Sequence, residues 1–245
     1  MISFTGQTVV ITGAAGGIAR ETARMMLAAG ANLVLGDLSE AAVRATAESL
    51  GGDAGRVACV PLDVTRPADC ERLFAEASAR FGGVDHLVHA AGIFPKVLVQ
   101  DMSLDQWRQC LAVNLDGSFL VCRASLPHLR EGSSIVNIAS ISGQRGSHSH
   151  AHYAASKGGL ISLTRSLSME LAPRTRVNCI APGIIDTAMA VDLIATRGPG
   201  YRDQTPLGRH GRPEEVAGAI CFLCSSLASF ITGETLQVNG GINRS

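Results

Sequence analysis

Short runs of apolar residues alternate along the chain with longer segments in which apolar residues recur at helical spacing. The short runs are rich in Val, Ile and Leu, and such runs between turn residues are typical of buried strands. Seven strands are predicted, at Thr8–Ile11, Asn32–Asp37, Val57–Leu62, Val84–His89, Ser134–Ala139, Arg176–Ala181 and Thr235–Val238.

The segments between the strands are predicted to be helices. Ser39 is a favoured N-cap, Pro67 suits a first helical turn, and Gly30 is a common residue just after a helix. The helices are expected from the first glycine turn to about Ala29, from Ser39 onwards, and at Pro67–Phe81, Leu104–Leu129, His152–Leu171 and Pro213–Cys224.

Strands that are apolar throughout and are connected by helices indicate a parallel sheet covered on both faces. The predicted fold class is therefore α/β, a Rossmann-type doubly wound sheet of seven parallel strands within one domain, residues 1–245. The spacing becomes irregular at about 187–212, where Gly198, Pro199 and Gly200 interrupt it. We expect a loop there that acts as a substrate lid, because long loops in compact domains are often functional.

Composition excludes several classes of partner. Basic and acidic residues number 21 each, which gives no bulk electrostatic basis for binding nucleic acid or an anionic membrane. No apolar run approaches the ~20 residues of a membrane span, and the N-terminus lacks the features of a signal peptide. Seven cysteines, an odd number, favour a reducing compartment, and we expect a cytoplasmic protein. Cys221 and Cys224 lie in an apolar helical run and are interpreted as core thiols.

Residues that could bind a ligand or take part in a reaction lie where the predicted strands end. Ligands of doubly wound sheets bind beyond the carboxyl ends of the strands. Six candidate residues lie at such a strand end: Gly13, Asp37, Asp63, Gly92, Ser140 and Pro182.

The first of these ends carries a glycine turn, Gly13 to Gly17, that opens a helix. The amide groups and dipole at a helix N-terminus suit a pyrophosphate. Asp37, 20 residues past Gly17, is placed to bind ribose hydroxyls. The alternative role for Asp37, as an N-cap, is already served by Ser39. A dinucleotide site is therefore predicted.

Tyr153 and Lys157 are four residues apart on a predicted helix and share one of its faces. A nearby cation favours the phenolate, although lowering a phenol pKa from ~10 to about 7 needs roughly 4 kcal/mol. A tyrosine tuned in this way acts as a general acid or base, and Ser140 offers a hydroxyl to the same substrate oxygen. The alternative for the pair alone is a surface tyrosine beside a solvated lysine.

Taken together, these motifs resemble the short-chain dehydrogenase/reductase family over nearly the whole chain. The matching residues, in order, are Thr12-Gly13 with Gly17, Asp63-Val64, Ala91-Gly92, Asn114, Ser140, Tyr153 with Lys157, Pro182-Gly183, Thr232-Gly233 and Val238 to Gly241.

The resemblance implies a catalytic tetrad of Asn114, Ser140, Tyr153 and Lys157. Tyr153 would exchange the proton, Ser140 would orient the substrate oxygen, and Lys157 would bind the nicotinamide ribose and lower the Tyr153 pKa. Asn114 would hold a water that links Lys157 to solvent. The cofactor would be NAD, bound by Gly13, Ala15, Gly16, Gly17, Ile18, Asp37, Leu38, Asp63, Val64, Ala90, Ala91, Gly92, Tyr153, Lys157, Pro182, Gly183, Ile185 and Thr187.

Two residues depart from the family pattern. Ala19 stands where the last glycine of the turn is usual, which would loosen helix packing on the phosphates slightly. His89 stands where an asparagine is frequent, and we interpret it as a structural residue that bonds backbone.

The resemblance also guides the substrate site. Phe94, Ser142 and His150 are expected to line it together with Ser140 and Tyr153, which suits a medium-sized, partly apolar alcohol or ketone. His148, His150 and His152 alternate, but no carboxylate or cysteine joins them, and no metal is expected.

The predicted function is an NAD-dependent oxidoreductase that interconverts a secondary alcohol and a ketone. A 3-oxoacyl-acyl-carrier-protein (or acyl-CoA) reductase remains an alternative, and a non-catalytic nucleotide-binding scaffold is a remote one. The small residues on the His152–Leu171 helix, with the family likeness, predict a homotetramer.

Overall fold

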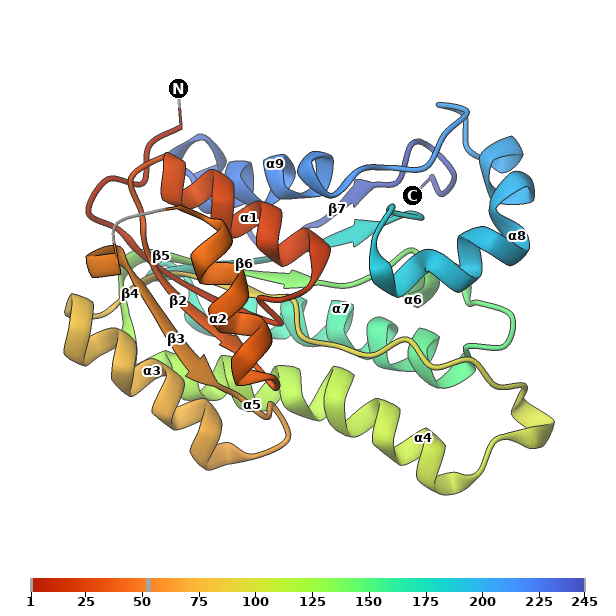
Figure 1. The fold of residues 1–245 in the computed structure, drawn as a ribbon, viewed down its shortest axis with the longest axis horizontal. Coiled ribbons are helices and arrows are strands. Elements are labelled where there is room, and N and C mark those ends of the chain that lie inside the picture. The colour runs from red at the N-terminus through yellow and green to blue at the C-terminus, as the bar shows by residue number, and fades with distance from the viewer. Residues whose placement is uncertain (1, 52–53, 245) are drawn as a thin grey trace.

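In the computed structural model, which describes residues 2–51 and 54–244, the strands form one parallel sheet in the order β3-β2-β1-β4-β5-β6-β7 (Figure 1). The predicted fold class is confirmed, whereas residues 1 and 245, the ends of the expected domain, lie outside the described residues. The strands are β1 (Thr8–Thr12), β2 (Asn32–Asp37), β3 (Val57–Pro61), β4 (Val84–His89), β5 (Leu129–Ile138), β6 (Thr175–Pro182) and β7 (Thr235–Val238).

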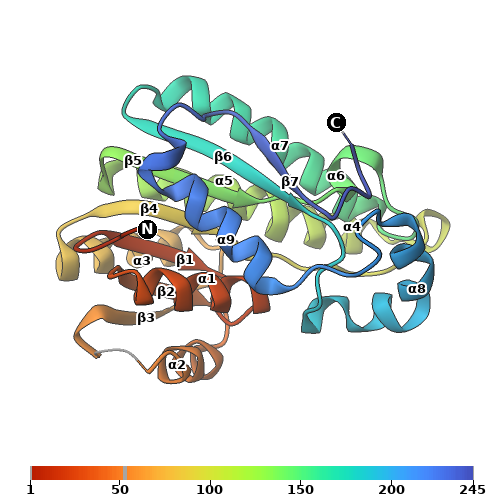
Figure 2. The ribbon, with the colours of Figure 1, turned by 90° about the horizontal axis from the view of Figure 1, so that it is seen from above.

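Helices cover both faces of the sheet (Figures 1 and 2). Helices α1 and α9 pack on one face and α3, α5 and α7 on the other, so the sheet has a hydrophobic core on each face. Successive residues of a strand point into different cores: Val9 and Ile11 lie in the core under α1 and α9, and Val10 lies in the core on the other face. This division explains why the strands are apolar throughout. The helices are α1 (Gly17–Ala28), α2 (Glu40–Ser49), α3 (Pro67–Phe81), α4 (Leu104–Leu111), α5 (Gly117–Ser125), α6 (Ser142–Arg145), α7 (Ala151–Leu171), α8 (Val191–Gln204) and α9 (Pro213–Cys224).

The chain reverses its direction of winding between β1 and β4, which are neighbours in the sheet. Such a switch point opens a crevice beyond the carboxyl ends of the strands. The glycine turn after β1 and the segment after β4 therefore face one another at this end of the sheet.

The predicted helix over Leu104–Leu129 is divided in the structure. Helix α4 passes through a π-helical turn, Ala112–Asp116, into α5, and a 3₁₀ turn at Leu126–His128 ends the run. Such π-helical turns are frequent at functional sites, and this one contains Asn114. Strand β5 then begins at Leu129, earlier than predicted, because Leu129 already pairs with Val84 of β4. The polar stretch around Gly132 forms an irregularity between this pair and the next one, His86 with Ser134.

The loop predicted at about 187–212 is largely helical, which corrects the sequence interpretation. Helix α8 runs through Gly198 and Pro199, although proline removes one helical hydrogen bond. The His210 side chain packs against Gly198 and its Nε2 lies 3.2 Å from the Gly198 carbonyl oxygen, so a contact with the following segment supports the interrupted helix.

Among the helices in the described part of the chain, none has the length and apolar character to cross a membrane.

Candidate functional site

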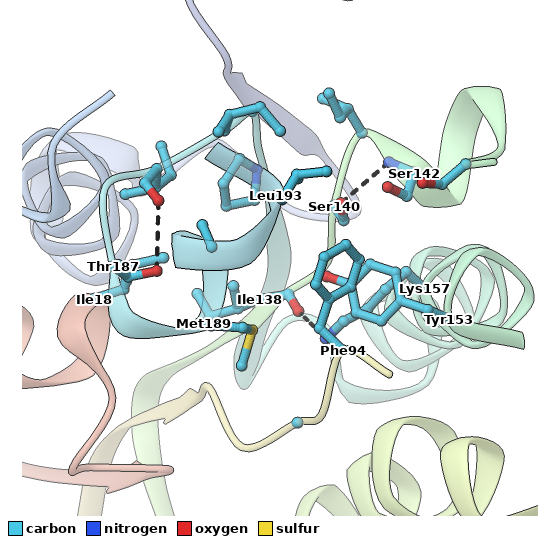
Figure 3. A pocket seen from close by; sticks show the side chains of 18 of the residues that line it. Ile18, Phe94, Ile138, Ser140, Ser142, Tyr153, Lys157, Thr187, Met189 and Leu193 are labelled. Atoms are coloured by element: carbon cyan, nitrogen blue, oxygen red, sulfur yellow. Dashed lines mark hydrogen bonds between the residues drawn. The ribbon is translucent and has the colours of Figure 1, made fainter. Parts of the chain in front are cut away.

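A cavity of about 900 Å³ lies beyond the carboxyl ends of the strands, between the glycine turn, α6, α7 and α8 (Figure 3). Its lining includes the glycine turn together with residues of α6 and α8. The predicted site residues that line it are Gly13, Ala15, Gly16, Gly17, Ile18, Ala90, Gly92, Phe94, Ser140, Ser142, Tyr153, Lys157, Pro182, Gly183, Ile185 and Thr187.

The glycine turn forms a cradle that side chains would fill. Gly13 has a φ of +64°, and a Cβ there would lie 2.7 Å from the Ala91 Cα. A Cβ at Gly17 would lie 2.9 Å from the Thr187 Cγ2. Helix α1 begins at Gly17, and no side chain caps its N-terminus, so its first amides remain available for an anionic ligand. This cradle fits the pyrophosphate of a dinucleotide.

Asp37 lies beside this cradle. Its Oδ2 accepts a hydrogen bond from the Ala15 amide at 3.0 Å, which fixes the carboxylate at the end of β2 against the glycine turn. Leu38 follows with its side chain 74% exposed, available for an apolar ligand surface. Arg20 was missed from the sequence: its Nη2 donates to the Ala15 carbonyl at 3.2 Å. Its position on the first turn of α1, where side chains lie near the turn, was the available signal.

Other predicted cofactor residues lie outside the cavity lining. The Asp63 Oδ1 accepts hydrogen bonds from the amide and the hydroxyl of Thr65, at 2.9 and 2.6 Å. Val64 is buried, and a Cβ at Gly117 would lie 2.8 Å from its Cγ2. Ala91 donates its amide to the Thr12 Oγ1 at 3.3 Å. Their contacts with adenine or ribose stay predictions.

Tyr153 and Ser140 meet inside the cavity (Figure 3). The Ser142 amide donates to the Ser140 Oγ at 3.1 Å and holds this hydroxyl in place. The Phe94 ring packs edge-on against the Tyr153 ring, with centroids 4.6 Å apart. Burial raises the pKa of Tyr153 to about 12, although a hydrogen bond with Ser140 acts in the opposite direction. The phenol is therefore protonated at neutral pH and poised to donate.

Lys157 lies on the same face of α7 as Tyr153, as predicted, but its effect on the phenol differs from the expectation. Its Nζ lies 5.8 Å from the centre of the Tyr153 ring and donates to the Ile138 carbonyl at 2.7 Å. Burial lowers the pKa of Lys157 to about 8. The expected fall of the Tyr153 pKa is absent in the chain by itself, because desolvation of the phenolate outweighs the other effects.

Asn114, in the π-helical turn, clamps the segment that follows β4. Its Nδ2 donates to the Ile93 carbonyl at 2.9 Å, and its Oδ1 accepts from the Ile93 amide at 2.8 Å. A Cβ at Gly92 would lie 3.1 Å from the Asn114 Oδ1 and 3.6 Å from the Lys157 Nζ. Asn114 and Lys157 therefore border Gly92 together, and the clamp fixes the wall that carries Phe94.

His89 is buried, and it bonds hydroxyls instead of the backbone groups that were expected. The Thr12 Oγ1 accepts from the Ala90 and Ala91 amides, so its proton is available to His89 Nδ1, 2.8 Å away. The Ser118 Oγ donates to the Asn114 carbonyl, so it accepts from His89 Nε2 at 2.8 Å. These directions assign the neutral tautomer with the proton on Nε2. His89 thus connects the end of β1 to the turn that holds Asn114.

Acid is expected to destabilise the fold through two buried histidines. Burial lowers the pKa of His89 to about 3 and that of His86 to about 4. In the unfolded chain, histidine binds its proton near pH ~6.5. The free energy of unfolding should therefore fall as the pH drops below that value, by about 1.4 kcal/mol for each pH unit and each histidine. Urea unfolding at pH 7.5 and 5.0 measures the loss, about 2 kcal/mol for each residue.

The matched variants for this test are His89→Asn and His148→Asn. The first should reduce the acid-induced loss by the share of one histidine, whereas the second should not change it, because His148 is exposed. An unchanged loss in His89→Asn would contradict the assignment.

The three alternating histidines diverge in the structure. His148 lines the cavity, whereas the buried His150 does not: its ring stacks on Phe94 at 4.0 Å and its Nδ1 donates to the Pro95 carbonyl at 2.8 Å. His152 is buried in α7. The expected substrate contact of His150 is therefore replaced by a supporting contact behind Phe94. Within residues 2–51 and 54–244, no group of three His, Cys, Asp or Glu side chains is arranged to hold a metal ion.

Cys221 and Cys224 are buried in α9, as interpreted, and burial raises their pKa values to about 11 and about 12. Ala19 is buried in the core beneath the glycine turn.

Comparison with known proteins finds a family model and relatives that are all described as oxidoreductases. The family model described as enoyl-(acyl carrier protein) reductase matches residues 13–243. The chain is 39% identical to the 3-oxoacyl-[acyl-carrier-protein] reductase FabG of Aquifex aeolicus, over 98% of this chain and 99% of that protein. It is also 39% identical to trans-4-hydroxycyclohexanecarboxylate dehydrogenase of Sinomonas cyclohexanicum, over 96% of this chain and 92% of that protein.

Among solved structures, a short-chain dehydrogenase/reductase described as glucose/ribitol dehydrogenase, from Brucella melitensis, superposes with a TM-score of 0.97. The two sequences are 48% identical, and the match covers 100% of this chain and 99% of the other.

Proposed function

Because the chain belongs to the short-chain dehydrogenase/reductase family, we propose that it uses NAD(H) to interconvert a secondary alcohol and a ketone, with Tyr153 as the general acid and base. The family assignment makes it an oxidoreductase that acts on CH–OH groups of small molecules with a nicotinamide cofactor. The choice of NAD, the role of each site residue and the substrate are our proposals.

The observation that carries the proposal is the meeting of Tyr153 and Ser140 in a cavity that continues to the glycine cradle. In ketone reduction, Ser140 holds the substrate oxygen and Tyr153 donates its proton to it; in alcohol oxidation, Tyr153 takes that proton back. When bound, the nicotinamide supplies or accepts the hydride. Phe94 packs edge-on against Tyr153, which restricts the orientation of the phenol ring.

The remaining residues hold the cofactor in this proposal. The turn from Gly13 to Gly17 takes the pyrophosphate, Asp37 the adenosine ribose, and Lys157 the nicotinamide ribose. Ile185 and Thr187 border the same cavity and take the carboxamide. Asp37 is the reason for proposing NAD, because its carboxylate accepts hydrogen bonds from ribose hydroxyls and repels a 2′-phosphate.

A second candidate is the reduction of a 3-oxoacyl group carried by an acyl-carrier protein or coenzyme A. The name of the Aquifex relative and the description of the family model favour it. The non-catalytic scaffold considered from the sequence is set aside, because the family assignment makes the chain an enzyme.

A cofactor-oxidation screen with the wild-type protein tests the proposal. The substrates are cyclic and linear ketones, oxo acids and 3-oxoacyl thioesters, each with NADH and NADPH, and the corresponding alcohols with the oxidised cofactors. Turnover of ketones or alcohols with NAD(H) is the expected result. Activity confined to acyl thioesters would favour the second candidate, and inactivity throughout would contradict both.

We further propose a homotetramer in the cytoplasm. In this proposal α7 and α5 meet their copies, and both carry exposed apolar side chains, with Met169 on α7 76% exposed and Phe119 on α5 46% exposed. The seven cysteines are free thiols, which favours a reducing compartment.

Light scattering of the wild-type protein should give the mass of a tetramer. Ser162→Asp, which places a charge on the exposed face of α7, should lower that mass, whereas Ser49→Asp on α2 should not. A stable wild-type monomer at micromolar concentration would contradict the tetramer.

A further inference from the structure

Outside the glycine turn, the cavity wall is formed largely by residues of α6 and α8 and of the segments beside them. Apolar side chains form much of this part of the wall, among them Phe94, Met189 and Leu193. Polar side chains lie between them, and these are Ser142, Arg145, His148, Tyr201 and Gln204.

The charges on the cavity wall have one sign. The described residues that line it include Arg145 and Lys157 but no aspartate or glutamate. Lys157 lies at the catalytic centre and donates to the Ile138 carbonyl. Arg145 is exposed, and among the described residues its guanidinium has one hydrogen bond, a long one of 3.4 Å from Nη1 to the Ile242 carbonyl. A guanidinium carries five N–H donors in a planar fork, so most of this donor set remains for a ligand.

Arg145 is held at a fixed place relative to the catalytic hydroxyls. It ends the short helix α6, one turn after Ser142, whose amide bonds Ser140. Helix α6 packs tightly on α7: a Cβ at Gly143 would lie 2.6 Å from the Lys157 carbonyl carbon. The contact between Gly143 and the Lys157 backbone thus fixes α6 relative to α7. Gly146, with a φ of +79°, ends α6 just after Arg145.

We propose that Arg145 binds a carboxylate of the substrate, so that the preferred substrates are hydroxy acids and oxo acids with an apolar skeleton between the two groups. The fork of a guanidinium matches the two oxygens of a carboxylate. The apolar wall of Phe94, Met189 and Leu193 covers the skeleton, while Ser140 and Tyr153 take the reacting oxygen. The name of the Sinomonas relative describes a substrate of this kind. This inference rests on the proposed function, since it deepens the use of the same site.

Binding to the NAD-loaded enzyme tests the inference without turnover. Isothermal titration should show that cyclohexanecarboxylate binds about tenfold more tightly than cyclohexanecarboxamide, the loss expected when a charge-assisted hydrogen bond is missing. In Arg145→Gln this difference should disappear, with little change for the amide. Arg108→Gln, an exposed arginine on α4 outside the cavity, is the matched control and should keep the difference.

Kinetics of trans-4-hydroxycyclohexanecarboxylate and its methyl ester provide the second measurement. Arg145→Gln should raise KM for the acid about tenfold, with kcat almost unchanged, and leave the ester unaffected. Equal affinity for acid and amide, or an equal loss in Arg108→Gln, would overturn the inference. So would an Arg145→Gln effect confined to 4′-phosphopantetheine, since the cation would then serve a carrier-linked phosphate.

The two proposals fail in different ways. Carboxylate binding through Arg145 without turnover of any alcohol or ketone would refute the proposed function alone. Turnover of neutral alcohols with no preference for acids would refute the carboxylate site alone.

Discussion

Replacement of Tyr153 by phenylalanine should lower kcat by at least roughly 1,000-fold, within the range that general acid–base catalysis contributes. The change removes the hydroxyl that exchanges the proton but keeps the ring that packs against Phe94 at 4.6 Å. Dinucleotide affinity should therefore change little. Steady-state kinetics in both directions and a fluorescence titration with NADH measure the two effects.

The chain contains a matched control for this variant. Its other tyrosine, Tyr201, also lines the cavity, but it lies on α8. Tyr201→Phe should keep kcat within a few-fold of the wild type. If Tyr153→Phe retained more than a few per cent of kcat, the assignment of the proton donor would be wrong.

The environment of Tyr153 affects the pKa of its phenol more strongly than the pairing with Lys157 does. Burial, the largest effect, raises the phenol pKa to about 12 even with the opposing hydrogen bond from Ser140, which favours the protonated form needed in ketone reduction. Alcohol oxidation needs the phenolate, and in the chain by itself the hydrogen bond with Ser140 does not offset that burial. The spacing of four residues identified the pair, but it carried no information on the desolvation that surrounds it.

Much of the fold was predictable because its signals are local. Buried strands appear in the sequence as apolar runs, and the predicted bounds of β2, β4 and β7 agree with the structure. Helix boundaries marked by a side-chain cap or a proline were equally clear, as at Ser39, whose hydroxyl accepts from the Ala42 amide, and at Pro67. Residues at strand ends converge because the strands are parallel, so the cavity followed from the order of the elements.

Features that depend on tertiary contacts were not predictable in this way. Helix α8 continues through Gly198 and Pro199 with support from His210, 12 residues away along the chain. The position of His150 behind Phe94 depends on a segment that arrives from β4. Arg145 carries no motif, and only the packing of α6 on α7 shows that it borders the cavity.

The cofactor preference is the second large effect expected. The wild-type enzyme should show a kcat/KM for NAD(H) on the order of 100-fold above that for NADP(H), since two hydrogen bonds to a charged acceptor contribute about this much. Asp37 lies against the glycine turn through the Ala15 amide, at 3.0 Å, and its charge opposes a 2′-phosphate. Kinetics with both cofactors at fixed substrate measure the ratio.

Because Arg20 lies nearby, a single change at Asp37 should weaken this preference. Its guanidinium reaches the Ala15 carbonyl, so a basic group borders the same turn that Asp37 contacts. Asp37→Asn keeps an acceptor for the Ala15 amide but removes the negative charge, and the remaining cation then attracts the 2′-phosphate. The ratio should fall by roughly tenfold or more, the difference between a charged and a neutral partner. Glu40→Gln, which removes a carboxylate on α2 that pairs with Arg44, should leave the ratio unchanged. A wild-type enzyme with equal use of both cofactors, or with a preference for NADP(H), would show that Asp37 does not bind the ribose.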